Sequence, residues 1–196
     1  MQSRRFACLL LGAWLAGIVL MAWVEWGRTR AVEIVLEGSN PAAAARLKAW
    51  NPDDARMVLA YAANEQARWY QAYWEDTQLF AGVLFFGFLL FGTREGKLAL
   101  GLSLAMLVIV LVERFVLSGE MLSLGRMIDF VRPDLHSGER NKFWVLHNTY
   151  RLAELLKLGA GSMLATVLLA GNPRPLAHPR QQVHVVDKAD HGHIDR

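Results

Sequence analysis

The sequence predicts an all-α integral membrane protein with four transmembrane helices and a helical extramembrane platform. Four long apolar stretches alternate with polar connections, and each stretch is long enough to cross a hydrocarbon core of about 30 Å. The mean hydropathy of +0.21 conceals these stretches because the connections dilute the average, so they are identified window by window. A chain of 196 residues has room for one compact unit.

The four spans are predicted at residues 6–26, 75–92, 98–117 and 143–171, within a membrane domain of residues 1–171. The first span follows Arg4 and Arg5, as in a signal peptide, but no small-residue cleavage site follows it, so we expect a retained anchor. A short connection between the second and third spans predicts an antiparallel hairpin, which makes these spans neighbours. The fourth span ends before Pro173, because proline lacks the amide donor that would continue a helix.

The first long connection, residues 27–74, contains two predicted helix starts. Asn40-Pro41 and Asn51-Pro52 each place a capping side chain before a proline at the first helical position. No further proline or glycine occurs before Gly82. One long helix should therefore begin outside the bilayer at Pro52 and continue through the second span.

The second long connection, residues 118–142, lies on the same side as the first and should pack against it. Gly119 predicts a break, followed by a short helix from Leu122 to Phe130. The tail, residues 172–196, is polar and predicted to be flexible. Weak binding of a transition metal is the alternative for its histidines, His178, His184, His191 and His193.

Charged residues inside the third and fourth spans form a predicted charge seam. Its members are Glu113, Arg114, His147, Arg151, Glu154 and Lys157. Glu113 and Arg151 fall at similar depths on adjacent antiparallel spans, so we expect them to pair as a structural clamp. Long basic side chains near span ends can also reach the headgroups. A proton or ion pathway is the alternative interpretation, because intramembrane ionisable groups often line such pathways.

Large aromatic residues gather at span ends on the side of the long connections, which indicates an aromatic belt. Trp69, Tyr70 and Tyr73 also lie on the predicted platform, and their types are enriched at interface cores. We expect them to form a surface for other membrane protein subunits or for a second copy of the chain. The alternative is that Trp50 and Trp69 fill the core between extramembrane helices.

Small residues recur in the first and fourth spans, where helices can approach closely. They are Gly12, Ala13, Ala16, Gly17, Gly159, Ala160, Gly161, Ser162 and Ala165. Such residues predict tight packing, either inside the chain or between subunits.

Composition and motifs argue against several classes of function. The net charge of +3 is spread along the chain with no block of like charges, so nucleic acid is not an expected partner. A single cysteine, Cys8, excludes disulfides within the chain and cysteine-based metal centres. No phosphate-binding glycine loop, nucleophile elbow or paired metal-binding motif occurs, so no enzymatic activity is expected. No cofactor or metal is predicted, and His147 is the one weak candidate for a ligand to a metal or a chlorin.

Two segments carry a family resemblance. The run from Glu139 to His147, followed by an apolar stretch, resembles the end of a broad bacterial family of four-span membrane proteins of unknown function. The segment Leu11-Gly12-Ala13-Trp14-Leu15-Ala16-Gly17 is similar to the opening of that family, which is distantly similar to a eukaryotic transmembrane protein associated with cisplatin resistance. The resemblance implies a four-span architecture in a bacterial inner membrane and supplies no catalytic residues.

These observations favour a non-enzymatic protein of the bacterial inner membrane, acting as a structural or accessory subunit of a larger membrane complex. The alternative is a small oligomeric transporter or efflux-related protein that uses the charge seam. Four spans are few for a pore within one chain, so transport would require an oligomer.

Orientation follows from the basic residues in the short connections. Arg94, Lys97 and the Arg4-Arg5 pair favour both termini in the cytoplasm, because short loops obey the positive-inside rule better than long ones. We predict that reporter fusions after Gly96 and after residue 196 report cytoplasm, whereas fusions after Ser39 report the opposite side. A cytoplasmic signal at Ser39 would show that the topology is the inverse of the predicted one.

Overall fold

The computed structural model describes residues 2–38, 40–93, 96–131 and 137–170, all of which lie in helices or in short turns between them. The helices, in chain order, are α1 (Gln2–Leu36), α2 (Pro41–Leu47), α3 (Pro52–Gly92), α4 (Lys97–Val112), the π-helical segment η1 (Glu113–Leu117), α5 (Ser118–Ile128) and α6 (Gly138–Ala170). No strand occurs in these residues, which confirms the all-α prediction.

Four helical stretches are long and apolar enough to cross a membrane: α1, α3, the continuous run of α4, η1 and α5, and α6. They are longer than a bilayer requires. The 41 residues of α3 extend about 62 Å at about 1.5 Å per residue, twice a hydrocarbon core of about 30 Å. The described residues end at Ala170, one residue before the predicted end of the fourth span. The predictions for the tail, residues 172–196, therefore lie outside them.

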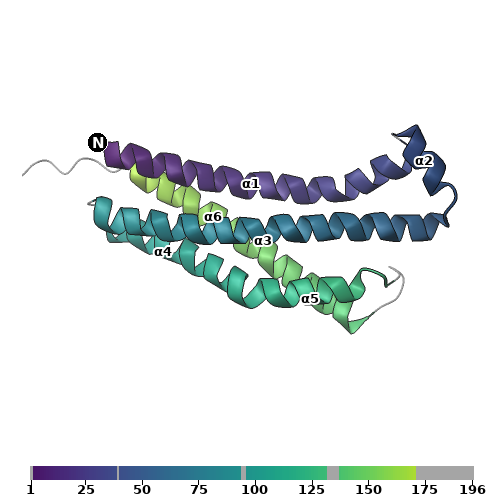
Figure 1. Ribbon diagram of the computed structural model, residues 1–196. Coiled ribbons are helices and arrows are strands. Elements are labelled where there is room, and N and C mark those ends of the chain that lie inside the picture. The colour runs from purple at the N-terminus through teal and green to yellow at the C-terminus, as the bar shows by residue number, and fades with distance from the viewer. Residues whose placement is uncertain (1, 39, 94–95, 132–136, 171–196) are drawn as a thin grey trace, which may run out of the picture.

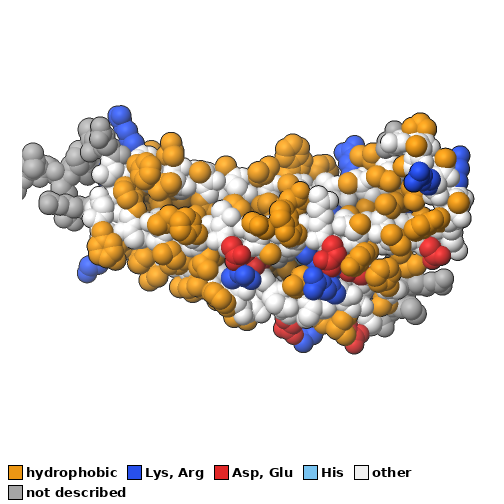
Figure 2. All heavy atoms as spheres, viewed as in Figure 1, with side chains coloured by type: hydrophobic (Ala, Val, Ile, Leu, Met, Phe, Trp, Pro, Cys, Tyr) orange, Lys and Arg blue, Asp and Glu red, His pale blue; other side chains and the backbone are white. Residues whose placement is uncertain are grey.

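The bundle has two unlike halves along its length (Figure 1). In the half that holds the start of α1, the hairpin between α3 and α4 and the end of α6, the face shown in Figure 2 is almost wholly hydrophobic, with basic side chains only at its extreme end. We call this the apolar half. Charged side chains of both signs begin midway and continue toward α2 and α5, and we call that end the polar half.

Both predicted helix starts in the first connection are confirmed. Asn40 caps α2, its Oδ1 accepting from the amides of Ala42 (3.0 Å) and Ala43 (3.3 Å). Asn51 caps α3, its Oδ1 accepting from the amide of Asp53 (3.0 Å). Each cap satisfies amides that the first helical turn leaves free. The helix that starts at Pro52 then runs without interruption to Gly92, as predicted.

The predicted break at Gly119 is wrong. The chain passes from α4 through η1 into α5 as one helical run, with Gly119 inside α5. A glycine lowers helix stability by only about 1 kcal/mol, and the burial of Met121 and Leu124 on α5 outweighs that loss. The irregularity lies earlier, in η1, where the backbone N–H of Ser118 donates to the Glu113 carbonyl and closes the widened turn.

The core fills the apolar half. Its buried side chains are Ala7, Leu11, Trp14, Ile18, Phe85, Leu89, Ala99, Met106, Val110, Leu164 and Leu168. They come from α1, α3, α4 and α6, and each of these helices contacts two of the others, with α3 against α4 as the hairpin predicted. The apolar half is therefore a closely packed four-helix bundle.

Two of the small residues stand at close helix contacts. A Cβ atom on Gly17 of α1 would lie 2.2 Å from the Trp74 ring of α3, and one on Gly161 of α6 would lie 2.5 Å from Leu15 of α1. Gly12 and Gly159 have open space at the same position. The small-residue prediction thus identifies two internal contacts.

Gly17→Ala is expected to lower stability by about 1–3 kcal/mol, because the bulky indole ring of Trp74 must move to admit the methyl group. Thermal unfolding in detergent measures the effect. Gly12→Ala is the matched control on the same helix and should be neutral or slightly stabilising. Equal melting temperatures for both variants would show that the contact at Gly17 is loose.

Candidate functional site

A buried ion cluster lies where the polar half meets the apolar half. Its centre is Lys157 of α6, whose side chain is 0% exposed. The ammonium donates to Glu113 Oε2 (2.5 Å) and to Gln78 Oε1 (2.7 Å), and it pairs with Glu154 Oε1 (3.0 Å). The ammonium thus makes two hydrogen bonds and a further ion pair, all to side chains inside the bundle.

Gln78 joins α3 and α1 to this cluster. Its Oε1 also accepts from the Trp14 indole Nε1 (3.2 Å), and its Nε2 donates to Glu154 Oε1 (3.1 Å). Gln78 is itself fully buried. Its side-chain amide lies among the charged groups of the cluster and not among apolar side chains. All four long helical stretches therefore contribute a side chain to one hydrogen-bonded network.

Glu75 adds a further buried carboxylate on the side of the polar half. It is 2% exposed, and its Oε1 accepts from the Ser118 hydroxyl (2.5 Å) and from Gln71 Nε2 (3.1 Å). Close by in sequence, Asp76 pairs with Arg114 on the outer surface (2.8 Å). Arg114, predicted as part of the seam, thus lies outside the buried cluster.

The predicted clamp between Glu113 and Arg151 is wrong, because Lys157 takes that place. Counted from the helix ends at Lys97 and Ala170, Glu113 lies about 24 Å along α4 and η1, Lys157 about 20 Å along α6 and Arg151 about 28 Å. Side chains lean toward the start of their own helix. Since α4 and α6 are antiparallel (Figure 1), Glu113 and Lys157 lean toward each other, while Arg151 leans away and is exposed.

The remaining seam residues separate into two groups. Glu154, with its side chain 17% exposed, belongs to the buried cluster through Lys157. His147 is half-buried in the polar half, where its ring stacks on Phe143 with centroids 5.8 Å apart. The sequence therefore identified three of the cluster's four charged members, Glu113, Glu154 and Lys157, but assigned their pairing incorrectly.

Two members of the cluster, Gln78 and Glu75, were not identified from the sequence. The pattern that reveals them is the spacing of Glu75, Gln78, Gly82, Phe85 and Leu89, which places all five on one face of α3. The last three of these are buried, and Phe85 and Leu89 belong to the core. A glutamate and a glutamine that continue the core face of a helix need buried partners.

Two hollows reach the cluster from the polar half. The first, of about 310 Å³, extends from Arg28 and Asp129 at its outer end to Glu75 and Ser118 at its inner end. The second, of about 370 Å³, lies between α1, α3 and α6 and reaches Glu154. His147 lines both hollows.

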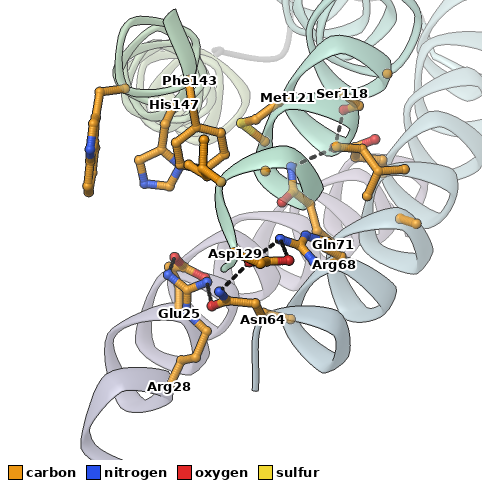
Figure 3. A pocket seen from close by; sticks show the side chains of 18 of the residues that line it. Glu25, Arg28, Asn64, Arg68, Gln71, Ser118, Met121, Asp129, Phe143 and His147 are labelled. Atoms are coloured by element: carbon orange, nitrogen blue, oxygen red, sulfur yellow. Dashed lines mark hydrogen bonds and ion pairs between the residues drawn. The ribbon is translucent and has the colours of Figure 1, made fainter. Parts of the chain in front are cut away.

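A polar network crosses the outer part of the first hollow (Figure 3). Arg28 pairs with Glu25 (2.9 Å) and donates to Asn64 Oδ1 (2.7 Å), whose Nδ2 donates to Asp129 Oδ1 (2.9 Å). Arg68 pairs with Asp129 Oδ2 (2.7 Å). The network ties α1, α3 and the end of α5 together and surrounds the hollow with polar groups.

The predicted partner surface is exposed and continuous. Trp69 and Tyr73 are 57% and 60% exposed, and Tyr70 is 39% exposed. The Trp69 ring lies 4.5 Å from that of Tyr73 and 5.3 Å from that of Tyr70, measured between centroids. Trp50 is also exposed, so the alternative that Trp50 and Trp69 fill an internal core is wrong.

Within the described part of the chain, no group of three or more His, Cys, Asp and Glu side chains is arranged to hold a metal ion. His147 has aromatic neighbours on two sides, Phe143 and Trp144. The tail histidines lie outside the described residues.

Comparison of the chain with family models, curated proteins and solved structures gave no significant match. The family resemblance of the sequence stays a prediction, and the function is argued from the chain's own geometry.

The pairing of Lys157 with Glu113 predicts strong non-additivity. Lys157→Met should lower stability by about 3–5 kcal/mol, because it leaves a buried carboxylate without its counter-ion. The double variant Glu113→Gln/Lys157→Met should lose less than the sum of the two single variants. Thermal unfolding of all three in the same detergent measures the coupling.

Arg151→Met is the matched control, since Arg151 lies on the same helix with its side chain exposed. It should change the melting temperature little. Strictly additive losses for Glu113 and Lys157, or a larger loss for Arg151→Met than for Lys157→Met, would show that the central pair is not the one described.

Proposed function

We propose that the protein is a non-enzymatic subunit of a larger membrane complex, held in the bilayer by its apolar half and bound to another membrane protein through α3. The observation that carries this proposal is the exposed ring cluster of Trp69, Tyr70 and Tyr73, which we call the aromatic surface. The family resemblance adds the expectation of a bacterial inner membrane.

An aromatic belt alone does not account for this surface. Trp23 and Trp26 on α1 are 66% and 68% exposed, and tryptophans of this kind suit a membrane–water interface. The rings of Trp69, Tyr70 and Tyr73 pack on one another instead and form a continuous patch. Contiguous exposed patches of large apolar residues are typical of binding surfaces.

The exposed apolar residues also continue beyond the level of a bilayer. Counted from the end of α3 at Gly92, Trp69 lies about 35 Å along the helix and Tyr61 about 46 Å, whereas a hydrocarbon core is about 30 Å thick. Tyr61 packs on Phe130, which is 58% exposed, and Met127 is 62% exposed. Lipid does not reach that level, so a protein is the better occupant.

The level of the aromatic surface also indicates the kind of partner. Trp69 and Tyr73 stand next to the boundary between the two halves, so a protein that covers them must itself lie at the membrane surface. A second membrane protein subunit satisfies this condition. A second copy of the chain satisfies it as well, and the mass of the native particle distinguishes the two.

The ion cluster favours a second candidate function, an oligomeric transporter. A path through one chain would have to cross the apolar half, which in the described residues is filled by the packed core. Transport would therefore need a path between copies. The accessory role needs no such path, and for that reason it is the function that the geometry supports better.

We predict that the protein extracted in mild detergent migrates in a particle larger than one 22.0 kDa chain. Trp69→Glu and Tyr73→Glu should each release the chain from that particle, because a charge placed in an apolar interface is left without a partner. Neither should change membrane insertion or the melting temperature of the free chain, since both side chains are more than half exposed. Light scattering after gel filtration gives the mass.

Trp50→Glu is the matched control, because Trp50 is an exposed tryptophan (53%) in the turn between α2 and α3 and lies outside the aromatic surface. It should leave the particle intact. A particle whose mass is a whole multiple of 22.0 kDa identifies a homo-oligomer, the alternative partner. A single chain at every concentration tested would refute the accessory role.

A further inference from the structure

We propose that the ion cluster binds one exchangeable proton, shared by the carboxylates of Glu113 and Glu154 and supplied from the side of the polar half. The first argument is the balance of charge. Glu113 and Glu154 bring two carboxylates to Lys157, which is the only cationic side chain buried in the described part of the chain. A surplus of negative charge is unfavourable in surroundings of low dielectric constant.

The second argument is a shortage of hydrogen-bond donors. Glu113 Oε1 is buried and has no hydrogen-bond partner. The Glu154 carboxylate is more exposed and has the Tyr150 hydroxyl beside it. Lys157 contacts the other oxygen of each carboxylate, Glu113 Oε2 and Glu154 Oε1. A carboxylic acid carries an O–H donor that a carboxylate lacks. One bound proton therefore removes the surplus charge and supplies a donor to a pair of carboxylates in which Glu113 Oε1 lacks one.

Charged groups on the neighbouring elements do not neutralise the surplus negative charge of the cluster. On α1, Glu25 and Arg28 pair with each other at the outer end of the first hollow. Asp76 of α3 and Arg114 of η1 pair on the surface. Glu75 is held by two neutral donors, the Ser118 hydroxyl and the Gln71 amide.

The groups on α6 face the mouth of the second hollow. Tyr150, Arg151 and His147 line that hollow together with Glu154. Arg151 is exposed, so water screens its charge more strongly than it screens the buried groups. Arg151 therefore lies at the entrance of the second hollow, and Lys157 is the basic side chain at the centre of the cluster.

Access to the cluster is one-sided. The first hollow connects Glu75 to the polar half, and the second runs from the polar half past Glu154 to Ile18 and Leu158, where it meets the packed core. On the opposite side, Val110, Leu164 and Leu168 are buried core residues within a few turns of Glu113 and Lys157. The proton should thus exchange with the solution on one side of the membrane, which describes a binding site and not a through-going path.

The test is infrared spectroscopy of the full chain in phosphatidylcholine bilayers across a pH series, which detects the carbonyl stretch of a protonated carboxyl group. We expect one such band to persist at neutral pH, where exposed aspartate and glutamate side chains are ionised, and to be lost only as the pH rises further. Glu113→Gln and Glu154→Gln should each abolish it, because either variant leaves Lys157 with one carboxylate as a simple ion pair and removes the shared site. Both variants keep a counter-ion for Lys157, and their melting temperatures report whether the fold is retained.

Glu75→Gln is the control for an acid in the same cluster that does not contact Lys157, and it should keep the band. A band that survives in both Glu113→Gln and Glu154→Gln, or that disappears only in Glu75→Gln, would overturn the proposal. So would a wild-type spectrum without an acid band at neutral pH, which decides the question even if a variant fails to fold. None of these outcomes depends on whether the chain has a protein partner.

Discussion

The ammonium of Lys157 must find all of its partners inside the bundle, and much of the architecture follows from that requirement. It is 0% exposed, and an isolated charge in such a place is strongly unfavourable. Glu113 reaches it from η1, Gln78 from α3 and Glu154 from its own helix, while Trp14 of α1 joins through Gln78. A slide of any long helix by one turn would leave a buried polar group unpaired, so the cluster fixes the register that apolar packing alone would define loosely.

The cluster also explains why the third span is irregular. The π-helical segment begins at Glu113 itself, and a widened turn changes the direction in which the following side chains point. Glu113 and Leu117 both face the interior, and Ser118 then reaches Glu75 across the interface with α3. The local departure from α-helical geometry thus allows one helical run to line the apolar core before η1 and the hydrogen-bonded polar interior after it.

Most of the fold could be predicted from the sequence, because it depends on signals local to each segment. Apolar length gives the spans, and Asn40 and Asn51 give helix starts that the structure confirms. The pairing of Glu113 could not be predicted by comparing depths alone, since the direction in which side chains lean decides between Lys157 and Arg151. Gln78 was missed because attention to charged residues overlooks a neutral amide, although its place on the core face of α3 marks it as buried.

The two proposed properties of the protein meet on α3. Trp69 and Tyr73 stand on its surface, and Glu75 and Gln78 face its interior within the next three turns of the same uninterrupted helix. A proton that enters the cluster changes the charge next to Gln78, and a partner that covers Trp69 and Tyr73 restrains the same stretch of backbone. If α3 takes different positions in the two protonation states, a partner that prefers one position must shift proton affinity by the same factor by which the proton shifts partner affinity. The link between a buried ion cluster and an exposed aromatic surface would then be a property of one rigid helix and would require no path across the membrane.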